Sequence, residues 1–574
     1  MTVNTLPSES SLKGVKKVEL FKQVWSKADK IIVCVGLALL SWASSWESSI
    51  IFIITPTVSS LLGANNLTAM IPIVLAILQT ALLPMYSKIA DMLGRAEAYS
   101  FSLLFYMVSF IVMATATNYD TIIGGKALYA IGHGGCIILA PILIGDLSSV
   151  VNRGLFQALY TLPSLLNFAT TPFAAEALMK VDQWRWVYGM IPLIILVAAA
   201  PLLTGLWHAE YKVRRIGMLA MTEKPSESPA KKSIGQRILW LINEIDLIGS
   251  LLLIAGLYLI LLPMVLARAR WGGWNSPTTL GTLISGVVAW ILFGFWEWKM
   301  AKKPVISVGR WESRNPVYGV LAASVLHLIN STNWQYLLTY LQVTRRASPT
   351  KATFMQRAYV MTSIVVQVGV GYCMKRTRIW RPFVWVGVAL LILGVALMIP
   401  ARLPSSSDAF IVVAQVVAGI GAGFLEIPIM VAVQSSVPHS DLAIVTSLFQ
   451  LGHSVGVSVG SAMAGAIWNS MLPNELMKYV PGQVDYRKVM ASIQFALALP
   501  QDQYEGVVRA YGEVQKTLSI IACCLSVLVF VFSVPLRSFG LDESEEDRVK
   551  AASAPAPTIV EDEEKLPDLR EQKL

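Results

Sequence analysis

The amino-acid sequence predicts an all-α integral membrane protein with about fourteen transmembrane helices. Hydrophobic residues make up 55% of its 574 residues and charged residues only 14%, against roughly 25% in a soluble domain. Apolar stretches of about 20 residues, the length that crosses the hydrocarbon layer of a bilayer, recur along the chain. Each should be a helix, because a chain in lipid must satisfy its own backbone hydrogen bonds.

The apolar stretches predict the positions of the transmembrane spans and the division of the chain into segments. We expect spans at 31–54, 68–88, 98–117, 119–145, 155–175, 187–207, 246–267, 278–298, 316–337, 352–374, 383–400, 409–433, 442–468 and 517–537. The chain then divides into an N-terminal tail (1–30), a first half of six helices (31–207), a central loop (208–245), two additional helices (246–298), a second half of six helices (299–537) and an acidic tail (538–574). An outer loop at 469–516 belongs to the second half.

Basic residues predict the orientation. Lys and Arg gather before the first span and in the short loops at 299–314 and 375–381, which places these segments in the cytosol. An even number of spans then makes both termini cytosolic. We interpret the net charge of +10 as this orientation signal, so the expected partners include membrane lipid and no nucleic acid. The first span is too extended for a cleavable signal peptide, and the five cysteines indicate no disulfide framework.

Internal repetition indicates two related halves. Ile131-Gly132-His133-Gly134 in the fourth span corresponds to Ile420-Gly421-Ala422-Gly423 in the twelfth. Many transporters are built from such repeats, with the substrate site between them. We expect a monomer, because two halves already build a complete pathway.

Charged residues beside span ends predict a cytoplasmic gate. Asp146 and Arg153 lie in the polar stretch that directly follows the fourth span. Asp91, Gly94 and Arg95 form a turn between the second and third spans. The carboxylates can pair with cations, Gly94 permits a tight turn, and Arg95 supplies charge-assisted hydrogen bonds. Such a latch holds the cytoplasmic side closed and breaks during transport.

The turn from Asp91 to Arg95 resembles the signature loop of the major facilitator superfamily, although Ser87 and Ala96 replace the motif's first glycine and last basic residue. Within that superfamily, nearly the whole membrane domain resembles the fungal siderophore-iron transporter family. The motifs that carry this resemblance are Tyr129-Ala-Ile-Gly132, Gly145-Asp146-x-Ser148-Ser149-x-x-Asn152-Arg153, Trp184-Arg185-Trp186-x-Tyr188-Gly189-Met190, Tyr340-Leu341-Gln342-Val343, Val433-Gln434-Ser435-Ser436-Val437-Pro438-His439, Gly465-Ala466-Ile467-Trp468 and the outer loop with Tyr504 and Tyr511-Gly512-Glu513-x-Gln515.

The resemblance implies the major facilitator fold and import of a ferric siderophore by proton symport through alternating access. The chelator already surrounds the iron with oxygen donors, so we expect no cofactor and no protein metal site. A carrier needs a roomy, partly aromatic cavity with a few polar groups. Our candidate substrate-binding residues are Trp42, Trp46, His133, Asn330, Trp334, Gln450, His453, Tyr504 and Tyr511.

Three carboxylates are candidate proton carriers: Glu47, Asp146 and Glu426. An ionisable group inside a span is costly, by about 2.5–3.5 kcal/mol on insertion scales, and therefore indicates function. Glu47 and Asp146 have the alternative of serving as surface or gate groups. The chain has no nucleotide-binding phosphate loop, so we expect a secondary transporter and not an ATP-driven pump or another enzyme.

Several candidates have a structural alternative. His133 and Cys136 share a helix face and could bind a metal, but two ligands are too few, and the glycines around them favour helix contact. Gly452, Gly456 and Gly460 also predict a close-packed face. Tyr504 and Tyr511 lie on one side of a helix and either meet a ligand or anchor the outer loop.

The sequence is compatible with other functions. A proton-coupled drug exporter with fourteen spans would have the same topology. Such exporters carry a Gly-Pro motif in the fifth span, whereas no glycine precedes Pro172 within the fifth span of this chain. Haem import and glutathione–proton exchange occur among relatives of the same family. A membrane sensor would need a signalling domain, which the tails are too short to form. The plasma membrane and an endosomal vesicle fit the orientation equally well.

Overall fold

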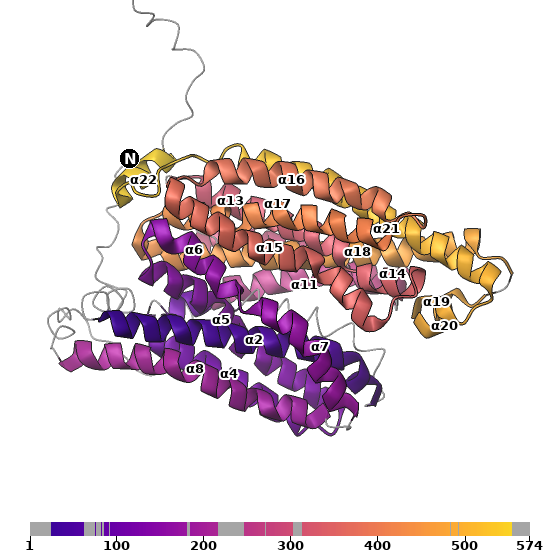
Figure 1. Ribbon diagram of the computed structural model, residues 1–574, viewed down its shortest axis with the longest axis horizontal. Helices are drawn as coiled ribbons and strands as arrows, with labels where there is room; N and C mark the ends of the chain where they lie inside the picture. The colour runs from indigo at the N-terminus through magenta and orange to yellow at the C-terminus, as the bar shows by residue number, and fades with distance from the viewer. Residues whose placement is uncertain are drawn as a thin grey trace, which may run out of the picture.

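The computed structural model describes residues 25–61, 75, 78, 82, 85–90, 92–180, 184–215, 246–269, 271–301, 311, 313–482, 484–491 and 493–553. All regular elements in these ranges are helices, which form two bundles lying side by side (Figure 1). The predicted all-α architecture is confirmed. Most of the second predicted span, Asp91, much of the central loop and most of both tails lie outside the described residues.

The first bundle is formed by the N-terminal half. Its described helices are α2 (Lys27–Leu61), α4 (Arg95–Ala114), α5 (Tyr119–Leu147), α6 (Val150–Thr161), α7 (Ser164–Lys180) and α8 (Trp184–Arg215). Gly132 of α5 lies so close to the backbone of Tyr106 in α4 that a Cβ atom would have no room. The expected helix contact around this glycine is therefore confirmed.

The fifth predicted span, 155–175, is two helices in the structure. α6 begins at Val150, directly after α5, and ends at Thr161, and α7 begins at Ser164. Pro163 lies at the break. Proline has no backbone N–H and its ring clashes with the preceding turn, so it interrupts a helix that hydropathy alone would continue.

The second bundle is formed by the C-terminal half. Its helices are α13 (Asn315–Trp334), α14 (Leu337–Thr344), α15 (Pro349–Thr377), α16 (Arg381–Ala401), α17 (Asp408–Ser435), α18 (Leu442–Tyr479) and α21 (Gln501–Ser533), with the short helices α19 (Tyr486–Ala491), α20 (Ile493–Leu497) and α22 (Glu545–Ser553). Gly452 and Gly456 of α18 lie against Ser324 of α13, which confirms the close-packed glycine face.

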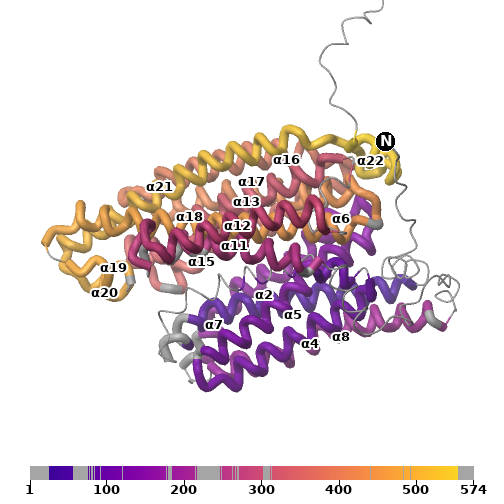
Figure 2. The backbone as a smooth tube through the Cα atoms, turned by 180° about the vertical axis from the view of Figure 1, so that it is seen from behind, coloured from indigo at the N-terminus to yellow at the C-terminus, as the bar shows by residue number. Residues whose placement is uncertain are grey.

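The two additional helices pack against the C-terminal bundle. They are α11 (Leu247–Ala269) and α12 (Pro277–Phe295), and a π-helical turn (Trp296–Met300) continues the latter. Leu253, Leu257 and Phe293 form an apolar cluster with Leu448 and Leu451 of α18. Figure 2 shows both helices beside α13 and α18.

The outer loop before the last span is shorter than expected. The prediction placed it at 469–516, but α18 continues to Tyr479 and α21 begins at Gln501. Helices of a membrane protein extend beyond the hydrocarbon layer, and an apolar pattern marks only the part inside it. α19 and α20 lie in the remaining connection.

The two halves meet where α6 packs on α15 and α17 and where α5 reaches α18. Each half has its own large apolar core. α6 and α22 lie at one end of the molecule, and α14, α19 and α20 lie at the other (Figure 1). We call the first of these the α22 end.

Nine helices among the described residues are long and apolar enough to cross a membrane. They lie within α2, α4, α5, α8, α12 with its π-helical turn, α16, α17, α18 and α21. The predicted number of fourteen is not confirmed, because the second span is largely outside the described residues, the fifth is broken, and α11, α13 and α15 do not meet the same criterion.

Candidate functional site

A buried ion pair lies at the α22 end of the first half. Arg95 is the first residue of α4, and Asp146 is the second-last residue of α5. The distance from Arg95 Nε to Asp146 Oδ2 is 2.9 Å, and the side chains are only 2% and 3% exposed. Gly94, with φ of 131°, makes the turn that starts α4. Two of the predicted gate residues are therefore in direct contact.

The second half reaches the same ion pair. His439, in the short turn between α17 and α18, has Nε2 at 3.7 Å from Asp146 Oδ1. The backbone N–H of His439 donates a hydrogen bond to Glu545 of α22 at 3.0 Å. The carboxylate of Asp146 thus lies between the two halves, with the C-terminal helix close by.

Arg153, the last predicted gate residue, also joins the halves. Its guanidinium donates to the carbonyl of Gly145 at 3.3 Å and to Ser435 Oγ of α17 at 3.4 Å. The side chain of Arg153 is buried, and a guanidinium remains a cation at neutral pH. The hydrogen bonds of this cation cross from α6 to α17.

A pair of glutamines also connects the two halves. Gln157 Nε2 of α6 donates to Gln434 Oε1 of α17 at 2.8 Å, and Gln434 Nε2 donates to Thr446 Oγ1 of α18 at 2.9 Å. Sequence reasoning quoted Gln434 in a motif without a role and did not single out Gln157. Their partnership requires the tertiary fold, because they are 277 positions apart.

Glu47 lies inside the first half, 1% exposed. Its Oε2 accepts hydrogen bonds from Tyr106 at 3.0 Å, Tyr129 at 3.1 Å and Ser48 at 3.2 Å. Lys126 Nζ lies 4.8 Å from the centre of the Tyr129 ring. A carboxylate with several hydroxyl donors and a cation close by is stabilised inside the membrane without being exposed at the surface.

Trp42, Trp46 and His133 belong to the same region. His133 stacks on Tyr129 with ring centres 4.8 Å apart, and its Nε2 is 3.2 Å from Ser44 Oγ. The backbone carbonyl of Trp42 accepts from Asn167 of α7 at 2.7 Å. The indoles of Trp42 and Trp46 are half-buried. Tyr129 therefore connects His133 to Glu47, whereas Trp42 contacts α7 through its backbone.

Three further predicted residues have their polar atoms bonded inside the second half. Trp334 Nε1 donates to Gln415 at 3.0 Å, Tyr504 Oη donates to the Val343 carbonyl at 2.8 Å, and Tyr511 Oη donates to the Val489 carbonyl at 3.3 Å. The side chains of Tyr504 and Tyr511 are buried. Both tyrosines therefore anchor the start of α21, which favours the structural alternative for them.

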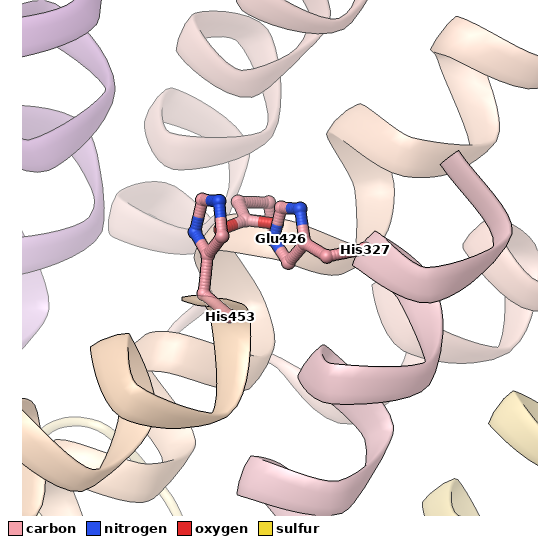
Figure 3. Close-up of side chains that lie close together, drawn as sticks. All are labelled: His327, Glu426 and His453. Atoms are coloured by element: carbon pink, nitrogen blue, oxygen red, sulfur yellow. The ribbon is translucent and has the colours of Figure 1, made fainter. Parts of the chain in front are cut away.

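Glu426 and His453 lie together with His327, which sequence reasoning missed (Figure 3). His327 Nε2 is 3.1 Å from Glu426 Oε2, and the rings of His327 and His453 are stacked 3.5 Å apart. Asn330 and Gln450 are half-buried, each three residues from one of these histidines. No local motif marks His327, whose partners come from two other helices.

Arg357 makes another contact between the halves. Its Nη1 donates to the carbonyl of Phe168 in α7 at 3.4 Å, and its guanidinium carbon lies 4.7 Å from the Phe168 ring centre. Arg357 lies inside the tenth predicted span, where a charged residue indicates a functional or structural contact. The sequence analysis did not use this indication.

Comparison with known proteins supports the fold. The human organic anion transporter MFSD10 is 14% identical, with 87% of this chain and 100% of that chain covered and a TM-score of 0.51. The proton:xylose symporter XylE is 12% identical, with 91% and 99% covered and a TM-score of 0.51. At these identities the likeness shows the fold alone.

Curated fungal proteins are more similar in sequence. The "MFS siderochrome iron transporter C" of Aspergillus fumigatus is 29% identical, with 95% of this chain and 90% of the relative covered. The "Siderophore iron transporter mirC" of Emericella nidulans is 28% identical, with 94% and 89% covered. The "Siderophore iron transporter 1" of Schizosaccharomyces pombe is 29% identical, with 90% and 83% covered. These relatives confirm the resemblance found in the sequence.

The family model of the Major Facilitator Superfamily matches residues 37–461, a span that runs from the first helix of one half into α18 of the other. This match covers most of the chain. Together with the two helical bundles, it shows that the chain belongs to the Major Facilitator Superfamily.

Proposed function

We propose that this protein imports ferric siderophore complexes across the plasma membrane by proton symport through alternating access. The observation that carries the proposal is the extent of the similarity to fungal proteins named siderochrome or siderophore iron transporters, which covers between 90% and 95% of this chain. A drug exporter would not require similarity of this extent to proteins with those names.

The substrate is proposed to bind between the two bundles. Trp42, Trp46 and His133 would contribute from the first half, and Asn330, Gln450 and His453 from the second. A siderophore surrounds its iron with oxygen atoms, so rings and neutral polar groups suffice to hold it. Trp334, Tyr504 and Tyr511 would position the surrounding helices, because their polar atoms are bonded within the second half.

The α22 end is proposed to face the cytosol and to carry the cytoplasmic gate. The basic residues of the 375–381 loop, between α15 and α16, favour this orientation. Arg95, Asp146, Arg153 and Gln157 would hold this end closed while the substrate binds from outside. The contacts must separate before the substrate can leave toward the cytosol.

Among the three expected proton carriers, we assign the role to Glu47. The supporting observation is that its carboxylate is buried and accepts a hydrogen bond from Tyr129, which stacks on His133, a residue of the proposed substrate site. Asp146 is held by Arg95 in the gate. Glu426 contacts an imidazole in the second half. Entry of one proton down an inside-negative potential supplies about 2.3 kcal/mol per 100 mV.

The test is uptake of radiolabelled iron by yeast that lacks its own siderophore carriers and expresses this chain. The iron is offered as several ferric siderophores, as haem and as a free salt, with and without a protonophore. We expect uptake of one siderophore class, abolished by the protonophore. Uptake of haem only, or of no siderophore despite surface expression, would contradict the proposal.

A pair of matched variants tests the proton carrier in the same cells. Glu47→Gln keeps the size of the side chain and removes its charge, so it should abolish protonophore-sensitive uptake. Glu505→Gln makes the same change at an exposed carboxylate of α21 and should leave uptake unchanged. Equal uptake by both variants would remove Glu47 from the mechanism.

A further inference from the structure

Three side chains able to bind a metal converge from three helices of the second half (Figure 3). They are His327 of α13, Glu426 of α17 and His453 of α18, and one ligand atom from each lies within 4.8 Å of the others. The three side chains are neither fully buried nor fully exposed. Among the described residues, no other group of three such side chains is as close.

Close helix packing brings the two histidines together. His453 lies between Gly452 and Gly456, whose faces contact α13 at Ser324, one turn before His327. The absence of side chains at these glycines lets the helices approach until the imidazoles stack, with ring centres 3.5 Å apart and an angle of 4° between the rings. Glu426 then reaches the pair from α17.

The arrangement differs from a simple hydrogen-bonded pair. His327 Nε2 is 3.1 Å from Glu426 Oε2, and the ring of His453 is stacked on that of His327. A proton shared between His327 and Glu426 would involve only two of the three groups. A metal ion uses one lone pair from each of the three groups.

We propose that His327, Glu426 and His453 bind a divalent first-row transition-metal ion. Two imidazole nitrogens and a carboxylate oxygen are a ligand set for Zn²⁺, Co²⁺ and Fe²⁺. In a tetrahedral site with bonds of 2.0–2.1 Å the ligand atoms are roughly 3.3 Å apart. The two rings are parallel in the present arrangement, so one imidazole must turn out of the stack before both nitrogens can face the same ion. The His327 and Glu426 side chains are 14% and 20% exposed, so the cluster is not sealed inside the core.

This site goes beyond the proposed siderophore import. Ferric iron in a siderophore already has its oxygen ligands, whereas the three side chains offer nitrogen and oxygen donors to a bare divalent ion. The site would let the protein bind metal that no chelator holds, inside the same half that contains Asn330 and Gln450. Its test needs no siderophore and no transport, so its failure and the failure of the import proposal are separate results.

The experiment is titration of the purified full-length protein in detergent with Co²⁺, without a polyhistidine tag. Bound Co²⁺ should show visible d–d absorption bands of a four- or five-coordinate nitrogen and oxygen site, and Zn²⁺ should displace them. His327→Gln, Glu426→Gln and His453→Gln should each weaken Co²⁺ binding at least about tenfold, since even residues that only support metal ligands contribute that much.

His208→Gln is the matched control, because His208 is an exposed histidine of α8 in the other half. It should bind Co²⁺ as the unaltered protein does. Thermal unfolding in the absence of metal shows whether each variant is folded, and Zn²⁺ should raise the melting temperature of the unaltered protein and of His208→Gln only. Absence of the Co²⁺ bands in the unaltered protein, or their persistence in all three ligand variants, would overturn the proposal.

Discussion

The guanidinium of Arg95 and the carboxylate of Asp146 are 2.9 Å apart and almost completely buried. The two residues are 51 positions apart in the sequence, one at the start of α4 and the other near the end of α5. His439 of the second half lies 3.7 Å from the same carboxylate. This ion pair therefore joins α4 to α5 within the first bundle, at the place where the second bundle contacts that bundle.

Removing one partner of this pair should destabilise the protein. Arg95→Met leaves the buried carboxylate of Asp146 without its nearest cation, and such a loss typically amounts to about 3–5 kcal/mol. We expect a lower melting temperature in detergent. Lys351→Met breaks an exposed ion pair with Asp408 and should lower stability by only about 0–1 kcal/mol. Similar losses of stability in the two variants would show that the buried ion pair stabilises the protein no more than the exposed one.

Gly371 should be required for the two halves to close at the α22 end. A Cβ atom there would lie 2.8 Å from Leu155 Cα and 2.9 Å from the Gly154 carbonyl oxygen, both backbone atoms of α6. Gly371→Ala should weaken the contact between α6 and α15 by about 1–3 kcal/mol, as overpacking does. Spin labels on the two helices should report a longer distance.

Gly369→Ala is the control for that change. Gly369 lies in the same helix, but its added Cβ would meet no atom within 4 Å. Both substitutions raise helix propensity by about 1 kcal/mol, so only the steric effect differs. An unchanged distance in Gly371→Ala, or the same increase in Gly369→Ala, would contradict the close contact.

Tyr129 should support Glu47 through its hydroxyl group. Tyr129→Phe keeps the ring that stacks on His133 but removes the donor at 3.1 Å from the carboxylate. Loss of a hydrogen bond to a charged group amounts to about 1.5–3 kcal/mol, so uptake of the transported chelate should fall roughly tenfold or more. Tyr211→Phe, at an exposed tyrosine of α8, should leave uptake unchanged. Normal uptake by Tyr129→Phe would show that this hydroxyl is dispensable.

Tyr504 and Tyr511 should affect stability more than substrate affinity. Their hydroxyls donate to the carbonyls of Val343 and Val489, at 2.8 Å and 3.3 Å. Each change to Phe should therefore destabilise the protein by about 1 kcal/mol and leave the KM for uptake unchanged. A raised KM with an unaltered melting temperature would instead favour direct contact with the substrate.

Much of the architecture could be predicted because it depends on local patterns. Apolar length predicts the helices, and the repeated Ile-Gly-x-Gly segments predict two halves. The spacing of Gly452, Gly456 and Gly460 predicts a close-packed face but does not name the helix that fills it. Hydropathy alone could not predict the break at Pro163, since the apolar character continues on both sides of it.

The candidate sites were predictable in part. Arg95 and Asp146 lie at helix ends in recognisable motifs, so their proximity at one end of the bundle could be inferred from the sequence. His327 lies inside the ninth predicted span, which marks it as a candidate, but its partners could not be inferred, because they lie on two other helices and no spacing along the chain connects them. The same reason explains the missed contact between Gln157 and Gln434.

Proton-coupled transport is the central claim, and reconstituted vesicles test it most directly. The purified protein is placed in liposomes with no other energy source, and accumulation of a labelled ferric siderophore is followed with and without an imposed gradient, acidic on the outside. We predict accumulation against the siderophore gradient only when the proton gradient is present, and its loss in Glu47→Gln. Accumulation that does not depend on the proton gradient, or export of the siderophore when the gradient is imposed, would contradict the claim.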